Sequence, residues 1–274
     1  MPDASPDTAR VAAFFDLDKT LLAASSTFAL SRGLRRRGLL PPHTAARSAV
    51  AHASYMVRGA DHVQMERMRD LLTELVAGWD RAVVEEVVAE ALDDVVLPLV
   101  YPEAAELVRW HQEYGRDVVV VSSGAQEVVG PIGDAIGATL TVGSTLEVVD
   151  GRYTGRIEHY TYGPAKAEVL RRLAAERGYD LAACYAYSDS ATDLPMLEAV
   201  GRPHAVNPGR RLTEHAETAG WPVLTLTPPA AAVRRLDALA APSPAAVGTV
   251  GAVGVGVAAT AGLGWYLARR RRRG

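Results

Sequence analysis

The chain has 274 residues and a formal net charge of −3; because the five arginines at 269–273 supply +5, residues 1–268 carry −8. A body this acidic is a poor nucleic-acid binder, so we exclude that class of function. The single cysteine, Cys184, rules out an internal disulfide framework, and the N-terminus lacks the basic-then-apolar pattern of a signal peptide. We therefore expect a globular domain in the cytoplasm.

The first half of the chain predicts two strands separated by helices. An apolar run at 11–15 is typical of a short buried strand, and four consecutive valines within 117–124 favour a parallel strand covered on both faces. Between them, residues 26–97 place apolar side chains three and four positions apart, as helices do. This block is predicted to be a set of helices inserted between two strands of one sheet.

The second half alternates strands and helices. A helix ending near residue 136 precedes two strand-like runs joined by Asp150-Gly151, a dipeptide typical of tight hairpins. Residues 163–178 predict an amphipathic helix. Further strands are predicted within 183–187, 203–208 and 222–226. This order predicts an α/β fold: a doubly wound, mostly parallel, Rossmann-like sheet with helices on both faces.

The composition changes after residue 226. Residues 227–244 are rich in Pro and Ala and predict a linker, whereas the 24 residues 245–268 hold no charge and can cross a bilayer. A basic tail, 269–274, follows. We expect a C-terminal hydrophobic helix that spans or lies on the inner cell membrane and anchors the cytoplasmic domain. A span would place the arginines outside, against the positive-inside tendency, so both arrangements stay open.

Polar side chains collect where the predicted strands end. Asp16 and Asp18 follow the first strand and are two residues apart, so both reach the crevice at its carboxyl end. The other candidates are Ser122, Ser123, Gly124, Lys166, Asp189 and Asp193. Carboxylates suit Mg²⁺, while lysine, hydroxyls and free backbone N–H groups suit phosphate oxygens. The set therefore predicts a site for a phosphate and a divalent cation.

The chain lacks other catalytic signatures. It has no Walker-type glycine loop, no HExxH, no CxxC and no GxSxG. With a carboxylate as the best nucleophile, a covalent aspartyl-phosphate is the expected route.

"DLDKTLL" at 16–22 resembles the DxDx[TV] signature of the haloacid dehalogenase-like superfamily. Ser122, Lys166 and the pair Asp189 and Asp193 follow in the order that this superfamily uses. The helical insertion is similar to the cap of subfamily IB, in the branch that includes phosphoserine phosphatase. The resemblance implies a catalytic core at 9–25 and 98–226 and a helical cap at 26–97.

The resemblance also implies roles. Asp16 would take the phosphoryl group, and Asp18 would protonate the leaving oxygen and then activate water. Ser122 and Lys166 would bind phosphoryl oxygens. From the residues themselves, Ser123 and Gly124 are further candidates for phosphate binding; the alternative for Ser123 is that it only shapes the loop, in which Gly124 frees backbone N–H groups for phosphate. Mg²⁺ would be held by the Asp16 carboxylate, the Asp18 carbonyl and Asp189, with Asp193 in support. The implied enzyme is a Mg²⁺-dependent phosphomonoester hydrolase.

Two positions depart from the family pattern. Ser25 lies near the place where phosphoserine enzymes carry a glutamate that meets the substrate amino group, and the chain has no acid between Asp18 and Asp61. Free phosphoserine is therefore not the expected substrate. Ser188 stands where the family commonly has glycine, a change that we expect to leave metal binding intact.

Several alternatives remain open. The membrane anchor suggests a lipid phosphate, but a soluble small-metabolite phosphate is a second candidate. These residues do not separate a hydrolase from a phosphotransferase, because only the acceptor differs. A non-catalytic membrane adaptor should have lost at least one of the acids or Lys166, and none is lost. Arg58, Arg67 and Arg69 in the cap are candidates for an anionic part of the substrate or for a solvated face.

Overall fold

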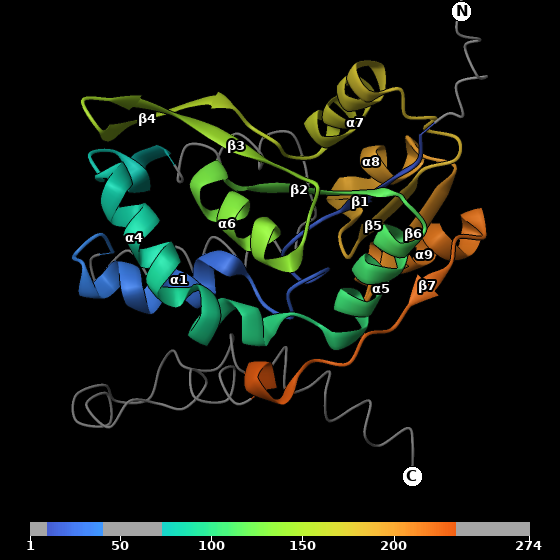
Figure 1. The fold of residues 1–274 in the computed structure, drawn as a ribbon, viewed down its shortest axis with the longest axis horizontal. Helices are drawn as coiled ribbons and strands as arrows, with labels where there is room; N and C mark the ends of the chain where they lie inside the picture. The colour runs from blue at the N-terminus through green and yellow to red at the C-terminus, as the bar shows by residue number, and fades with distance from the viewer. Residues whose placement is uncertain (1–9, 41–72, 234–274) are drawn as a thin grey trace, which may run out of the picture.

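The computed structural model of the protein describes residues 10–40 and 73–233. Its centre is a seven-stranded sheet of order β4-β3-β2-β1-β5-β6-β7, parallel throughout except for the pair β3 and β4 (Figure 1). The strands are β1 (Ala12–Phe15), β2 (Asp117–Ala125), β3 (Leu140–Val149), β4 (Arg152–His159), β5 (Tyr185–Ser188), β6 (Arg202–Val206) and β7 (Val223–Leu224).

Helices follow most strands and return the chain across the sheet. They are α1 (Ser26–Arg36), α4 (Arg81–Ala91), the short turns η1 (Leu92–Val96) and η2 (Leu97–Leu99), α5 (Pro102–Glu113), α6 (Gln126–Ile136), α7 (Pro164–Arg177), η3 (Ala191–Asp193), α8 (Leu194–Glu198) and α9 (Arg210–Ala219). Helix α7 ends at Gly178, whose φ of 73° is a left-handed cap that glycine adopts without steric cost.

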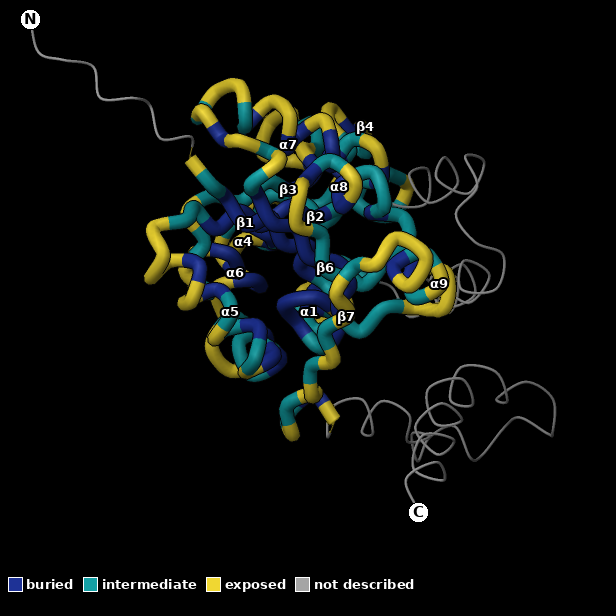
Figure 2. Tube along the Cα trace, turned by 90° about the vertical axis from the view of Figure 1, so that its right-hand side faces the viewer, coloured by how far each residue is buried: buried dark blue, intermediate teal, exposed yellow. Residues whose placement is uncertain are grey.

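The sheet is buried on both faces. In β1, Ala13 and Phe15 pack on the face covered by α1, α4, α5 and α6, whereas Ala12 and Phe14 pack on the face covered by α7, α8 and α9. The valines of β2 alternate in the same way. Figure 2 shows the buried strands at the centre and the exposed positions on the outer helices. Cys184 is fully buried beside β1, as its apolar surroundings in the sequence predicted.

The hairpin of β3 and β4 turns at Asp150 and Gly151, with φ values of 51° and 78°. Positive φ at both turn positions is the geometry that the Asp-Gly pair predicted. The hairpin also contacts the segment that enters α4: Gly78 N donates to Tyr153 O at 2.8 Å, and Tyr153 N donates to Trp79 O at 3.0 Å. The outer part of the hairpin is therefore held by backbone hydrogen bonds to residues outside the sheet.

The predicted α/β class, with a mostly parallel sheet covered on both faces, is confirmed. The predicted hydrophobic helix at 245–268 and the arginines of the cap lie outside the described residues, so they stay predictions. Within residues 10–40 and 73–233, no helix has the length and apolarity to cross a bilayer. The division into a core and a cap at 26–97 also stays a prediction, because 41–72 are not described.

Candidate functional site

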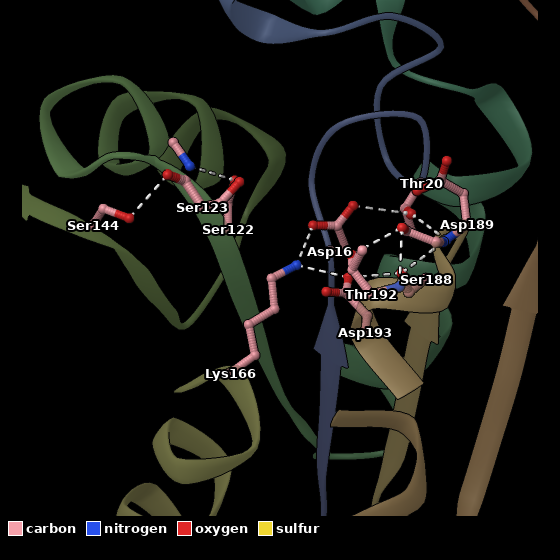
Figure 3. Close-up of polar contacts among 12 residues, drawn as sticks. Asp16, Thr20, Ser122, Ser123, Ser144, Lys166, Ser188, Asp189, Thr192 and Asp193 are labelled. Atoms are coloured by element: carbon pink, nitrogen blue, oxygen red, sulfur yellow. Dashed lines mark hydrogen bonds and ion pairs between the residues drawn. The ribbon is translucent and has the colours of Figure 1, made fainter. Parts of the chain in front are cut away.

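The candidate site lies at the carboxyl ends of β2, β1 and β5, which are neighbours in the sheet. Asp16 is the residue directly after β1, and Ser188 is the last residue of β5. Because the strands are parallel, their ends deliver these side chains to one edge (Figure 3). Lys166, from the first turn of α7, points to the same place.

Lys166 is the centre of a buried network. Its Nζ donates to Asp16 Oδ1 at 2.6 Å and to Asp193 Oδ2 at 2.7 Å. Ser188 Oγ donates to the same Asp193 oxygen at 2.7 Å. Asp193 therefore holds the lysine together with Asp16, and all four side chains are buried.

Thr20 joins the first acid to the loop after β5. Its hydroxyl donates to Asp16 Oδ2 at 3.3 Å and accepts from the backbone N–H of Asp189 at 3.1 Å. One hydroxyl thus places the Asp189 backbone relative to the Asp16 carboxylate. Within the described residues, no hydrogen-bond donor contacts the Asp189 carboxylate itself.

Asp18 faces the beginning of α1. Its Oδ1 accepts from the Ser26 N–H at 2.8 Å, and its Oδ2 accepts from Ser25 Oγ at 3.2 Å. Ser25, which the sequence placed near the substrate, is therefore bonded to the second acid. These two contacts fix the orientation of the Asp18 carboxyl group.

The carboxyl-terminal end of β2, which the structure extends through Ser122, Ser123 and Gly124 to Ala125, forms a separate cluster next to this network (Figure 3). Ser122 Oγ accepts from the Gly124 N–H at 3.2 Å. The carbonyl oxygen of Ser123 accepts from Ser144 Oγ on β3 at 2.8 Å, and Ser144 Oγ accepts from the Thr161 N–H at 3.1 Å. The predicted phosphate loop is thus held by the base of the hairpin.

Burial and charge shift the pKa values of these groups. Burial raises the pKa of Asp16 to about 6, where the Lys166 charge opposes the rise and the Asp193 charge adds to it. Burial also raises the pKa of Asp189 to about 7, with a further contribution from Asp16. Burial alone would lower the pKa of Lys166, but the charges of Asp16 and Asp193 raise it, so the ammonium stays protonated.

The pKa of Asp18 is shifted mainly by burial and by hydrogen bonds. Burial raises the pKa of Asp18, and the hydrogen bonds from Ser26 and Ser25 partly offset that rise. A carboxyl group with a raised pKa holds its proton closer to neutral pH, which suits a general acid.

The groups here that could hold a divalent cation are the carboxylates of Asp16 and Asp189, to which the prediction adds the Asp18 carbonyl. Asp16 and Asp189 are desolvated and raise each other's proton affinity, a repulsion that a bound cation relieves. Hard oxygen donors of this kind suit Mg²⁺. No cluster of three or more Asp, Glu, His or Cys side chains suited to a metal occurs in the described part of the chain.

The sequence therefore identified most of the groups that gather here, and the structure adds three hydroxyls. Thr20 is the last position of the DxDx[TV] signature, but its hydrogen bonds, like those of Ser188 and Ser144, were not predicted from the sequence. Ser122, Ser123 and Gly124 lie at the same edge, but none of them is hydrogen-bonded to Asp16 or Lys166 within the described residues.

Residues 13–198 match the sequence pattern of the haloacid dehalogenase-like hydrolase family. The chain belongs to this family. The prediction of an enzyme in it, similar to the phosphoserine phosphatase branch, is confirmed.

Two relatives illustrate the similarity. The chain is 51% identical over 263 residues to the inhibition of morphological differentiation protein of Streptomyces azureus, covering 96% of this chain and 95% of that protein. It is 31% identical over 244 residues to a phosphoserine phosphatase of Mycobacterium tuberculosis (strain H37Rv), covering 88% and 77%.

Solved structures share the fold. A protein of unknown function from Bordetella pertussis Tohama I superimposes with a TM-score of 0.68 at 32% identity, over 79% of this chain and 99% of that one. A phospho-aspartyl intermediate analogue of phosphoserine phosphatase superimposes with a TM-score of 0.59 at 19% identity, over 85% and 99%. The hydrolase fold of the family is therefore that of this chain.

Proposed function

We propose that this chain is a Mg²⁺-dependent phosphomonoester hydrolase that works through an aspartyl-phosphate at Asp16. The observation that carries the proposal is the Lys166 Nζ at 2.6 Å from Asp16 Oδ1. A buried lysine bonded to a carboxylate at a sheet end can neutralise the charge of an incoming phosphoryl group beside its nucleophile.

Asp16 is the proposed nucleophile. One oxygen is bonded to Lys166, and the other receives only the long contact from Thr20 within the described residues, so it is the freer one to attack. Attack forms a bond from this oxygen to phosphorus, and the bond from phosphorus to the ester oxygen breaks. With a pKa of about 6, the Asp16 carboxyl is ionised at neutral pH.

Asp18 is the proposed proton carrier. Its raised pKa and its bonds to Ser25 and Ser26 keep a carboxyl group oriented two residues from the nucleophile. It gives its proton to the leaving alcohol oxygen and then takes one from the water that attacks the phosphorus. Inorganic phosphate and the free Asp16 carboxylate result.

The proposed Mg²⁺ donors are the Asp16 carboxylate, the Asp18 carbonyl and Asp189. When bound, the cation would neutralise charge on the phosphoryl oxygens and align them. Asp193, bonded to Lys166 and Ser188, supports the site by holding the lysine. Ser122 and the N–H groups of the loop through Gly124 are proposed to bind the remaining phosphoryl oxygens.

For the substrate, we keep a membrane lipid phosphate and a soluble metabolite phosphate as the two candidates. The relative from Mycobacterium tuberculosis is named for phosphoserine. In this chain, however, Ser25 bonds to Asp18 and offers no negative charge to a substrate ammonium group. We therefore do not propose free phosphoserine.

The decisive experiment measures phosphate release from lipid and soluble phosphomonoesters with Mg²⁺, using Asp16→Asn as the blank. We expect release that depends on Mg²⁺ and a loss of at least about a thousandfold in the variant. Equal release by Asp16→Asn would refute the aspartyl-phosphate route. Trapping of a phosphoryl group on Asp16 after acid quenching is a second readout.

Membrane attachment through residues 245–268 is a separate proposal that rests on the sequence alone. We expect the full chain to remain with membranes after a carbonate wash, and a chain ending at residue 244 to be released. Release of both chains would contradict the anchor while leaving the proposed chemistry untouched.

A further inference from the structure

Lys19 occupies the loop between Asp18 and Thr20 in an uncommon backbone conformation. Its φ is 65°, in the left-handed region that lysine rarely adopts. The neighbours on both sides are held in the site, since Asp18 accepts hydrogen bonds from Ser25 and Ser26 and Thr20 bonds to Asp16. The Lys19 backbone is therefore fixed at the edge of the site, while its side chain is exposed.

The Lys19 ammonium lies close enough to the site to act on two of its acids. Burial raises the pKa values of Asp18 and Asp189, and the positive charge of Lys19 lowers both. Neither acid is within ion-pair distance of it; the lysine ion pairs among the described residues are both made by Lys166. The ammonium is thus exposed, near the leaving-group acid, and unpaired within this part of the chain.

The surrounding segment has charge of one sign. From Lys19 to the end of α1 the charged residues are all basic. They are Lys19, Arg32, Arg35 and Arg36. No acid stands in the first turn of α1, where Ser26 contacts Asp18. Of these four, only Lys19 lies beside Asp18; Arg35 and Arg36 stand in the last turn of α1, at the end away from Ser26.

We propose that Lys19 determines specificity by binding a second anionic group, carried on the alcohol of the phosphomonoester substrate. This inference rests on the proposed function. A carboxylate or a second phosphate on the alcohol supplies the same chemistry, an anionic oxygen that accepts a charge-assisted hydrogen bond from an ammonium. The chain has 27 arginines and only two lysines, Lys19 and Lys166. A position that keeps lysine in such a chain indicates a need for a compact ammonium rather than a planar guanidinium.

The test compares four small esters with the wild type and Lys19→Met. Glycerol 3-phosphate has a neutral alcohol, 3-phosphoglycerate adds a carboxylate, propane-1,3-diyl bisphosphate adds a phosphate, and phosphoethanolamine adds an ammonium. Each is measured as an inhibition constant against hydrolysis of p-nitrophenyl phosphate, which yields a value even for an ester that is hydrolysed slowly. Met keeps the length of the side chain and the same backbone cost.

We expect Lys19→Met to weaken binding of the anionic esters by about fivefold relative to glycerol 3-phosphate, the size of an exposed ion pair. Phosphoethanolamine should bind more tightly, because a repulsive charge is lost. Lys19→Arg should restore much of the preference, and Arg32→Met, the same charge change further along α1, should not alter it. If Lys19→Met weakens binding of only one of the two anionic esters, that ester carries the anionic group that Lys19 binds.

Added salt supplies a second readout. In the wild type, binding of the anionic esters should weaken with salt more steeply than that of glycerol 3-phosphate, and Lys19→Met should remove the difference. Equal changes for all four esters would overturn the inference, since an effect through Asp18 alone does not depend on the alcohol. Failure of the wild type to hydrolyse p-nitrophenyl phosphate would instead overturn the proposed function.

Discussion

Asp193 Oδ2 lies 2.7 Å from Lys166 Nζ, and this ion pair is buried on both sides. The lysine is therefore held between two carboxylates, because Asp16 Oδ1 lies 2.6 Å from the same nitrogen. Each carboxylate also accepts from a hydroxyl: Asp193 from Ser188 at 2.7 Å, and Asp16 from Thr20 at 3.3 Å. Asp193 thus acts through Lys166, and replacing Asp193 should change the position of the lysine beside Asp16, the proposed nucleophile.

Asp193→Asn should reduce kcat for p-nitrophenyl phosphate by about ten- to a hundredfold, since the ammonium loses one of its two anchors. The Asp193 charge raises the pKa of Asp16, so its removal should lower that pKa from about 6 and move the acid limb of the rate profile to lower pH. The measurement is kcat/KM against pH, which reports the pKa values of the free enzyme. Asp134→Asn, an exposed change on α6, is the control; an unmoved acid limb in Asp193→Asn would mean that the loss is only structural.

Ser144→Ala tests the support of the proposed phosphate loop. The lost hydroxyl donates to the Ser123 carbonyl at 2.8 Å and accepts from Thr161 N, so this end of β2 loses a side-chain hydrogen bond to β3 while the backbone pairing of the two strands remains. We expect KM for p-nitrophenyl phosphate to rise about three- to tenfold, with a smaller change in kcat. A change of this size corresponds to the loss of one buried hydrogen bond. Thr154→Ala, an exposed position on the same hairpin, should leave both constants unchanged.

A conservative variant separates positioning from stability. Ser144→Thr retains the hydroxyl and should restore KM. If Ser144→Ala lowers only the melting temperature and leaves KM at the wild-type value, the hairpin does not position the loop.

Much of this site was predictable because short, local patterns carry it. The acids after an apolar strand, the valine strand and the Asp150-Gly151 turn each follow from residues next to one another. The hydroxyl partners could not be found in this way. Thr20 meets the Asp189 backbone across 169 positions, and Ser144 meets Ser123 across 21, so only the folded sheet brings them together.

Ser25 shows a different limit. The sequence could show that an acid is missing near this position, but not that the serine hydroxyl turns to Asp18 at 3.2 Å. Orientation of a side chain in a loop depends on the strands that hold both ends of the loop, and no local periodicity records it. Ser188 lies in β5, but its hydroxyl donates to Asp193 Oδ2 at 2.7 Å only because the chain turns back after the strand, and no local periodicity records that turn.

The metal-free protein should lose stability as the pH rises through the range of its two acids. The pKa of Asp16 is raised from 3.8 to about 6 and that of Asp189 from 3.8 to about 7, so the folded state binds these protons more tightly than the unfolded state. The stability that these two bound protons contribute is fully present below about pH 4, and it is lost as the pH rises through 6 to 7. Mg²⁺ should therefore raise the melting temperature more at pH 8 than at pH 5.

The measurement is the melting temperature with Mg²⁺ and with a chelator at each pH. Asp189→Asn removes one of the two repelling charges, so it should be more stable than the wild type in chelator at pH 8 and gain little from Mg²⁺. A melting temperature that rises equally with Mg²⁺ at both pH values, or in the variant as in the wild type, would contradict the assigned donors.

His111 should have the opposite effect on stability: its contribution should be lost as the pH falls. The ring is fully buried, with Nδ1 3.3 Å from Arg116 Nη1 and Nε2 2.9 Å from the Tyr187 hydroxyl. A guanidinium only donates, so Nδ1 must accept and Nε2 must carry the proton that is given to Tyr187. Burial and the Arg116 charge lower the pKa of His111 from 6.5 to about 3.

Because the folded pKa lies below the unfolded one, the unfolded state binds a proton first as the pH falls below 6.5. The stability contributed by neutral His111 is present above that value and declines by about 1.4 kcal/mol per pH unit toward pH 3. His111→Gln keeps an N–H donor near Tyr187 but cannot titrate, so its free energy of unfolding should fall less between pH 7 and pH 4.5 than that of the wild type. Urea unfolding of both proteins at the two pH values measures this, and parallel losses would show that His111 is not the group that titrates.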